Sequence, residues 1–345
     1  MNAPLTVAPF PAALAANPYC TLLYRGIEQA GARIVRDGQL DTQWLRRHRG
    51  AVDVLHFHWI DSHYQHWRGG PFSLLTLAKF AHKLFLARSL GYKIVWTMHN
   101  FAPHDSKSPL ADGLARWLML HLGSVVVHCQ YAKSLIANGN GRSVSVIPHG
   151  NYMGWHPNQV TKEEARKRLG LPSDAKVFLT FGLMRGYKGH TRLVNDFKRL
   201  GRDDAHLLVV GANYDDCEKM TRGQVETDGH VHYHRRFVPD DEVQVYFNAA
   251  DFAVFPFEKV LTSGAVILSL SFGRPVIVPR LGCLGEMENS GAALVYDPAD
   301  EDGLLSALRK GMDLDAAKAS ERAFRIARAL DWTMIAEKHL RVYTN

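Results

Sequence analysis

Residues 177–189 read Val-Phe-Leu-Thr-Phe-Gly-Leu-Met-Arg-Gly-Tyr-Lys-Gly, an apolar run that leads directly into a glycine-rich basic loop. The first five residues are almost continuously apolar, which is typical of a strand buried on both faces of a parallel sheet. Gly182 and Gly186 allow tight turns, and Arg185 and Lys188 lie three residues apart. The two cations could hold one diphosphate, since charge-assisted hydrogen bonds contribute roughly 1.5–3 kcal/mol each. The alternative interpretation is a solvated basic loop.

The alternation of apolar runs and helical patterns extends in both directions from this stretch, and it predicts two α/β domains with parallel sheets. The chain of 345 residues also exceeds what one hydrophobic core usually supports. The expected strands are Leu5–Ala8, Ala32–Val35, Val52–Phe57, Lys93–Met98, Ser124–His128, Val144–Ile147, Val177–Phe181, Leu207–Val210, Val231–His234, Phe252–Phe255 and Pro275–Val278. The expected helices are Tyr19–Ala30, Phe72–Leu90, Ala111–Leu122, Tyr131–Asn138, Ala265–Leu270 and Ala316–Ala329.

The domain boundary is expected near residues 150–159, a stretch rich in Gly, Asn and Pro that precedes a capping box at Thr161. This division gives domains 1–150 and 151–330 and a tail, 331–345, that is expected to pack at the domain junction. Both domains are predicted to be Rossmann-like.

A second anion-binding element is predicted at Leu261-Thr-Ser-Gly264, between a strand and a helix. Thr262 or Ser263 can cap the helix, and Gly264 leaves the amides of the first turn open. A helix N-terminus binds anions through its free N–H groups and its dipole. Because ligands bind at the carboxyl ends of strands in open α/β sheets, this element and the basic loop could face one ligand.

The positive charge of the chain is concentrated in its first half. Residues 1–150 carry 15 Lys and Arg against 7 Asp and Glu, whereas the remainder carries 26 against 27. Such a basic half predicts an anionic partner, either a membrane surface or a nucleic acid. The basic residues occur among aromatic ones, as expected at a membrane surface. The residues concerned are Arg46, Arg47, Arg49, Lys79, Lys83 and Arg88 with Trp44, Trp67, Phe72, Phe80 and Phe85.

No RNP-like motif, zinc finger or recognition helix accompanies these basic residues, so no nucleic-acid partner is expected. The apolar N-terminus lacks a basic n-region and contains prolines, and no long uncharged apolar stretch is present. We therefore expect a cytoplasmic protein that is peripherally associated with the inner membrane.

Four segments resemble, in the expected order, motifs of the GT-B glycosyltransferases. They are Ile147–Gly150, Phe181–Gly189, Asn248–Phe252 and Ser271–Val276. The large retaining group of that fold carries an E-x7-E pair, but Val260 and Leu268 occupy the corresponding positions here. A retaining mechanism is therefore not expected. Glu258, two residues out of register, is a candidate for positioning donor or acceptor.

A closer resemblance is to the β-mannosyltransferases of xanthan-type exopolysaccharide assembly, an inverting group that also lacks the glutamate pair. It is carried by Asn17–Tyr19, Val54–Trp59, Thr97–His104 and the helix entered at Ser263-Gly264. The resemblance implies a GT-B fold, with two Rossmann-like domains facing each other across a cleft. It also implies an N-terminal acceptor-binding domain and a C-terminal nucleotide-sugar-binding domain. The implied donor is GDP-mannose and the implied acceptor is a polyprenyl-diphosphate-linked oligosaccharide.

UDP-sugar-dependent β-glucuronosyl- and β-glucosyltransferases fit the same resemblance and remain an alternative. No cofactor is expected beyond the nucleotide-sugar substrate. An alternative of another class is a non-catalytic nucleotide-binding or nucleic-acid-binding protein.

An inverting transfer needs a general base for the acceptor hydroxyl and stabilisation of the leaving diphosphate. The first candidate for the base is Asp61, just beyond the strand that ends near Trp59, although a helix-capping role would also explain it. His58 and His99 are further catalytic candidates. Candidates for positioning donor or acceptor are Asn100, His104 and His149. No HExxH or CxxC pattern is present, so no metal site is predicted.

Overall fold

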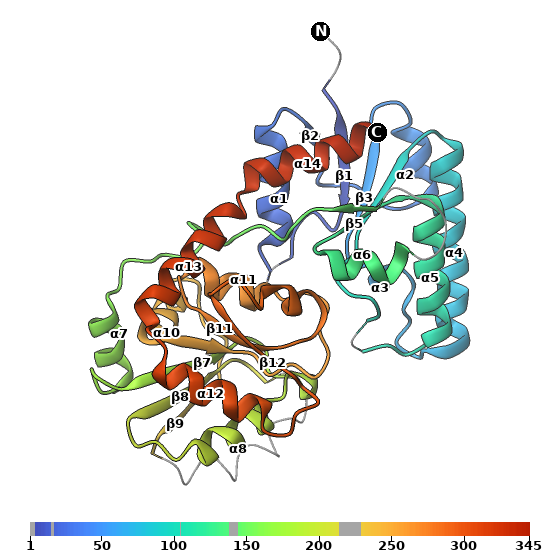
Figure 1. Cartoon of the computed structure of the whole chain (residues 1–345). Helices are drawn as coiled ribbons and strands as arrows, with labels where there is room; N and C mark the ends of the chain where they lie inside the picture. Colours follow the sequence, from blue (N-terminus) through green and yellow to red (C-terminus); the bar gives the residue numbers. More distant parts are fainter. Residues whose placement is uncertain (1–3, 15–16, 104, 138–143, 214–228) are drawn as a thin grey trace. The chain divides into compact units, whose positions relative to one another are not determined.

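The computed structural model describes residues 4–14, 17–103, 105–137, 144–213 and 229–345, which form two compact units (Figure 1). The N-terminal unit comprises Met1–Gly150 and Asp331–Asn345, and the C-terminal unit comprises Asn151–Leu330. Each unit contains one six-stranded parallel sheet with helices packed against it. The expected α/β class with two parallel sheets is confirmed.

The N-terminal sheet has the strand order β2-β1-β3-β4-β5-β6. Its strands are β1 Thr6–Phe10, β2 Arg33–Ile34, β3 Val54–Phe57, β4 Lys93–Thr97, β5 Ser124–Val127 and β6 Val144–Val146. Its helices are α1 Tyr19–Gln29, α2 Thr42–Arg47, α3 Asp61–Tyr64, α4 Gly70–Ser89, α5 Pro109–Leu122, α6 Gln130–Ala137 and α14 Trp332–Thr344. Because parallel crossovers are right-handed, the reversal of direction after β2 places α1 on one face of the sheet and α4 and α5 on the other.

The C-terminal tail forms α14, which packs against α1 within the N-terminal unit. Asp331 caps this helix by accepting from the amides of Thr333 and Met334. Its Trp332 ring lies so close to Gly150 that a Cβ there would be 2.4 Å from a ring atom. Only glycine fits at this point, which gives Gly150 of the Ile147–Gly150 motif a packing role.

The C-terminal sheet has the order β12-β11-β10-β7-β8-β9. Its strands are β7 Lys176–Phe181, β8 Ala205–Val210, β9 Val231–His234, β10 Phe252–Val254, β11 Val276–Pro279 and β12 Ala293–Tyr296. Its helices are α7 Lys162–Leu169, α8 His190–Leu200, α10 Val243–Ala249, α11 Gly264–Ser271, α12 Gly303–Asp313 and α13 Ala316–Ala329, with the 3-10 turns η1 Gly186–Lys188 and η2 Gly282–Met287. Central β7 pairs with β8 from Lys176↔Ala205 to Phe181↔Val210.

All eleven expected strands and all six expected helices have observed counterparts, with ends displaced by at most two residues. Thr161 caps α7 as expected, accepting from the Glu164 amide. Strand β12 and helices α2, α3, α10, α12 and α14 were not predicted. Strand β12 and helices α2 and α3 have only four to six residues, which is too short for periodicity to identify them.

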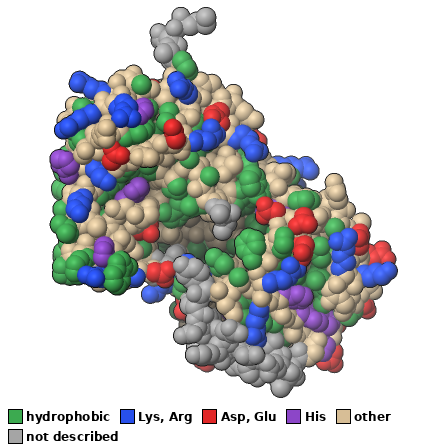
Figure 2. Space-filling view, turned by 180° about the vertical axis from the view of Figure 1, so that it is seen from behind, with side chains coloured by type: hydrophobic (Ala, Val, Ile, Leu, Met, Phe, Trp, Pro, Cys, Tyr) green, Lys and Arg blue, Asp and Glu red, His purple; other side chains and the backbone are tan. Residues whose placement is uncertain are grey.

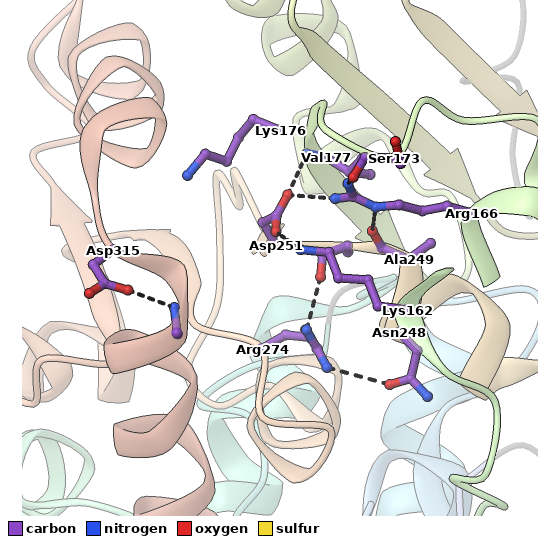
Figure 3. A network of polar contacts seen from close by, with 12 residues as sticks. Lys162, Arg166, Ser173, Lys176, Val177, Asn248, Ala249, Asp251, Arg274 and Asp315 are labelled. Atoms are coloured by element: carbon purple, nitrogen blue, oxygen red, sulfur yellow. Dashed lines mark hydrogen bonds and ion pairs between the residues drawn. The ribbon is translucent and has the colours of Figure 1, made fainter. Parts of the chain in front are cut away.

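A charged network around the buried Asp251 holds together the amino edge of the C-terminal sheet (Figure 3). The Asp251 carboxylate accepts from Lys162 Nζ at 2.6 Å, from Arg166 Nη2 at 2.9 Å and from the Val177 amide at 2.8 Å. Arg274 donates to the Ala250 carbonyl oxygen at 3.1 Å. Asp251 precedes β10 and Val177 lies near the start of β7, so these residues lie at the edge opposite the ligand-binding end of the strands. Asp251 and Arg274, both in family-like motifs, therefore have structural roles.

Candidate active site

The basic loop of the C-terminal unit begins where central β7 ends. Gly182 has φ +114°, and a Cβ placed on it would lie 3.5 Å from Lys188 Nζ. The amine of Lys188 therefore lies next to the start of its own loop, at the carboxyl end of β7. The Lys188 amide donates to the Arg185 carbonyl oxygen at 3.0 Å, which closes the turn between the two cationic residues.

Burial lowers the pKa of Lys188 to about 8, and the neighbouring Arg185 charge adds to this shift. A lysine with a lowered pKa lies in surroundings that disfavour its positive charge when no anion is bound. A bound anion would offset the free-energy cost of holding this positive charge in partly buried surroundings. Lys188 is thus a stronger candidate for an anion ligand than a solvated surface lysine would be.

The basic loop is tied to the segment that leads toward α11. The Glu258 amide donates to the Tyr187 carbonyl oxygen at 2.8 Å, while the Glu258 side chain is exposed. Gly189 has φ +68°, and a Cβ there would lie 2.1 Å from the Pro256 carbonyl oxygen. No side chain can be accommodated at Gly189. This close packing fixes the basic loop against the segment that follows β10.

Helix α11 begins at Gly264, with Ser263 as its N-cap. The Ser263 Oγ accepts from the Val266 amide at 3.4 Å, and Thr262 and Gly264 are half-buried. The sequence left Thr262 and Ser263 as candidate N-cap residues, and in the structure Ser263 is the N-cap. The first-turn amides of α11 have no partner within the helix and remain suited to an anion.

In the N-terminal unit, buried histidines follow the carboxyl ends of successive strands. His58 comes directly after β3, His99 two residues after β4, and His128 directly after β5. Their rings form a hydrogen-bonded chain, with His58 Nδ1 3.1 Å from His99 Nε2 and His99 Nδ1 3.3 Å from His128 Nε2. The chain continues from His58 Nε2 to Tyr24 Oη at 2.5 Å and on to His56 Nδ1 at 2.9 Å.

One carbonyl group determines where the protons of this chain lie. His128 Nδ1 lies 3.0 Å from the Ile147 carbonyl oxygen, which can only accept, so this nitrogen carries the proton. In the neutral ring His128 Nε2 then accepts from His99 Nδ1–H, and His99 Nε2 accepts from His58 Nδ1–H. Tyr24 consequently donates to His58 Nε2. Both ring nitrogens of His58 and of His99 are therefore engaged in buried hydrogen bonds.

The buried surroundings also keep these histidine rings neutral. Burial lowers the pKa of His56, His58 and His99 well below the usual value, with neighbouring histidines adding to the shift. Burial also lowers the pKa of His128 to about 4. His56 Nδ1 lies 2.7 Å from Tyr343 Oη, which connects the histidine chain to α14.

Asp61 is the first residue of the short helix α3, and it is half-buried rather than capping through its side chain. Burial raises its pKa, and the nearby carboxylates of Asp112 and Asp105 raise it further. Asp112 is itself buried and accepts from Tyr64 Oη at 2.7 Å and from the Ser106 hydroxyl. Within the described ranges, the Asp61 carboxylate makes no side-chain hydrogen bond or ion pair, unlike Asp112.

The other sequence candidates lie on the same carboxyl edge or outside the described residues. Asn100 follows β4 and is half-buried. His149 is buried, its Nδ1 lies 2.7 Å from the Gly150 carbonyl oxygen, and burial lowers its pKa to about 3. His104 lies outside the described residues. Among the residues that the structure describes, no group of three or more His, Cys, Asp or Glu could hold a metal ion.

Sequence reasoning missed His128, Tyr24 and Asp112. A signal for His128 was present, because it follows its strand as His58 does. Tyr24 and Asp112 gave no such signal, since each meets its partners only through the tertiary fold.

Residues 175–313, which include both the basic loop and the start of α11, match the family model described as "Glycosyl transferases group 1". A relative named as a mannosyltransferase aligns with 95% of the chain and one named as a glycosyltransferase with 88%, and solved structures share the two-sheet fold. The protein is a GT-B glycosyltransferase. The expected fold class, with one six-stranded parallel sheet in each unit, is thereby confirmed.

One relative of this glycosyltransferase is the GDP-mannose:glycolipid 4-beta-D-mannosyltransferase of Xanthomonas campestris pv. campestris. It is 27% identical over 344 residues, which cover 95% of this chain and 88% of the relative. A putative teichuronic acid biosynthesis glycosyltransferase, TuaC of Bacillus subtilis, is 30% identical over 65% of this chain and 56% of its own length.

Two solved structures resemble the glycosyltransferase over nearly its whole length. Sucrose-phosphate synthase from Thermosynechococcus elongatus has a TM-score of 0.74 at 15% identity, covering 99% of this chain and 98% of the other. Anabaena HepE in complex with UDP has a TM-score of 0.74 at 14% identity, covering 99% of this chain and 100% of the other. At this identity the likeness concerns the fold alone.

Proposed function

We propose that this glycosyltransferase moves a hexose from a nucleotide-diphosphate sugar to a lipid-linked oligosaccharide in bacterial exopolysaccharide assembly, with inversion at the anomeric carbon. The best candidate donor is GDP-mannose, which the name of the Xanthomonas relative includes. The observation that carries the proposal is the half-buried Lys188, held beside Gly182 in a loop bonded to the segment leading into α11.

The donor diphosphate is assigned to the C-terminal unit. Arg185 and Lys188 supply positive charge, and the amides after Ser263 supply hydrogen-bond donors. As the bond between the anomeric carbon and the phosphate oxygen breaks, negative charge grows on the diphosphate, and these groups stabilise it without requiring a metal ion. Glu258 is assigned to positioning the donor or the acceptor, because its backbone is fixed to Tyr187 while its side chain remains exposed.

Asp61 is assigned the role of general base. It accepts the proton of the acceptor hydroxyl as that oxygen attacks the anomeric carbon on the face opposite the leaving diphosphate. Its carboxylate is partly shielded, and its raised pKa makes it a stronger base than a solvated aspartate. His58 and His99 were also candidates for this role. We assign them to positioning instead, because accepting a proton would require either ring to break a buried hydrogen bond.

Asn100, His104 and His149 are retained as residues that position donor or acceptor, since they follow strands of the same sheet. The N-terminal unit is accordingly assigned the acceptor and the C-terminal unit the donor. The lipid-linked acceptor suggests a cytoplasmic enzyme associated with the inner membrane. Among the described helices, none is long and apolar enough to span a bilayer.

A UDP-sugar is the alternative donor. The structure of HepE in complex with UDP, which has a similar fold, supports this alternative. The two donors are separated by measuring thermal stabilisation with GDP, UDP and dTDP. Transfer to a lipid-linked glucose-type acceptor is then followed by NMR of the new anomeric linkage. The proposal expects stabilisation by GDP and a β-linked product. An α-linked product from an α-linked donor would overturn the inverting mechanism, and stabilisation by none of the nucleotides would overturn the donor site.

A further inference from the structure

Helix α4 is apolar on its outer side as well as on the side that faces the sheet. Leu77, Phe80 and Leu84 are buried, yet Leu75 and Phe85 are each more than half exposed. None of the twenty residues of this helix is acidic. Large apolar side chains that are exposed beside basic ones are unusual on a helix that faces only water.

The neighbouring helix α5 repeats the pattern. Leu110, Leu114 and Trp117 are exposed at the spacing i, i+4, i+7, which places them on one stripe, and Trp117 is 53% exposed. Helices α4 and α5 pack against each other on the same face of the N-terminal sheet. Their exposed apolar residues, with Trp67 just before α4, are called here the α4–α5 face. Its members are Trp67, Phe72, Leu75, Phe85, Leu110, Leu114 and Trp117.

Basic side chains surround this face. The Arg68 guanidinium lies 4.6 Å from the centre of the Trp67 ring and 5.3 Å from that of Phe72. Lys79 is exposed on α4, and Lys107 Nζ donates to the Trp67 carbonyl oxygen. Figure 2 shows hydrophobic, basic and histidine side chains intermixed along the left margin of the surface, with few acidic ones. The one acidic residue of α4 and α5, Asp112, is buried.

We infer that the α4–α5 face docks the protein onto an anionic phospholipid bilayer. Trp, Phe and Leu side chains gain free energy by entering the interfacial layer, while Arg and Lys beside them attract anionic headgroups. This surface differs from the one expected from sequence, because Trp44 and Phe80 are buried in the core and cannot contact lipid. The α5 residues had not been recognised.

The position of the face fits a lipid-linked acceptor, and in this respect the inference rests on the proposed function. Helices α4 and α5 begin after β3 and β4, so their first turns lie at the carboxyl edge of the sheet. Asp61 and His99 follow the same two strands. An acceptor glycan attached to a membrane lipid would therefore be presented next to the candidate base.

The test is flotation of the full-length protein with vesicles of phosphatidylcholine, with and without phosphatidylglycerol. One variant, Trp67→Ser/Leu75→Ser/Trp117→Ser, removes apolar contacts. The other, Arg68→Glu/Lys79→Glu, reverses two charges. Its matched control is Arg25→Glu/Arg341→Glu, which makes the same change on α1 and α14, at the other face of the same sheet. Thermal unfolding confirms that each variant folds.

We expect the parent protein to bind vesicles that contain phosphatidylglycerol. The affinity of both face variants for these vesicles should be about tenfold lower or more, and that of the control should stay within about twofold of the parent's. Equal binding by the parent and both face variants would overturn the inference, as would an equal loss in the control. Transfer to a detergent-solubilised acceptor is measured in parallel. If transfer is absent while vesicle binding follows the expected pattern, the proposed function fails and the docking face stands.

Discussion

His128 Nδ1 lies 3.0 Å from the carbonyl oxygen of Ile147, and this bond sets the proton positions of a histidine chain that reaches His56. The chain crosses the carboxyl ends of β3, β4 and β5, where it connects loops that are distant in sequence. Its members are buried and fully hydrogen-bonded in their neutral forms. The chain can therefore hold the loops around Asp61 in place, but only while its rings stay uncharged.

Acidification is expected to destabilise the N-terminal unit. A histidine that is buried neutral takes up its proton more readily in the unfolded chain, so unfolding is favoured as the pH falls from about 6.5 towards the folded pKa. For His128, with a folded pKa of about 4, the loss reaches about 3 kcal/mol by pH 4. Urea unfolding followed by tryptophan fluorescence reports it, because the Trp59 ring stacks on His99. A midpoint that is constant from pH 7 to 5 would contradict the neutral chain.

Asp61→Asn is expected to abolish transfer while leaving donor binding intact. The amide retains the size of the side chain but cannot accept the acceptor's proton, and general-base catalysis typically contributes 10²–10⁴-fold. Steady-state kinetics should show the loss in kcat, with nucleotide affinity unchanged by calorimetry. His58→Gln, which alters the hydrogen-bonded chain, should retain measurable turnover. A fully active Asp61→Asn enzyme would remove Asp61 as the base.

Asp251→Asn is expected to lower the free energy of unfolding by about 3 kcal/mol, because it leaves the buried Arg166 guanidinium without its carboxylate. Chemical denaturation measures this change. The matched control is Asp302→Asn, which breaks an exposed pair with Arg199 and should cost less than about 1 kcal/mol. Similar costs for the two variants would argue against a structural role for Asp251.

Donor affinity is expected to fall above about pH 8. In the donor-free protein Lys188 has a pKa of about 8, and a bound diphosphate raises that pKa by favouring the protonated amine. Binding in alkaline solution must then take up a proton, which weakens the observed affinity as the pH rises. Calorimetry in buffers of different ionisation enthalpy measures this proton uptake directly. Proton release, or no exchange in the parent, would show that Lys188 does not contact the diphosphate.

Much of the architecture could be predicted because parallel sheets produce near-continuous apolar runs. The run from Val177 to Phe181 was recognised in this way, and the glycines beyond it indicated the basic loop. The packing of Gly189 against Pro256, by contrast, depends on two segments that meet only in the folded chain. The same holds for Tyr343 and His56, which are 287 residues apart in sequence.

The surface features were harder to predict than the core. The sequence shows aromatic residues at Trp44, Trp67 and Phe80 without indicating which of them faces solvent. In the structure Trp67 is 71% exposed, whereas the other two are buried. Hydrophobic periodicity does not distinguish buried from exposed aromatic residues on α4, because large apolar side chains lie on both sides of that helix.

The central claim is that Arg185 and Lys188 hold the donor's diphosphate, and calorimetric titration with GDP and GDP-mannose tests it most directly. The account predicts that Arg185→Ala and Lys188→Ala each weaken binding about tenfold or more, since each removes a charge-assisted contact of about 1.5–3 kcal/mol. Arg309→Ala, an exposed residue of the same unit, serves as the control and should not change the affinity. Unchanged affinity in both loop variants, with their folds intact, would contradict the account.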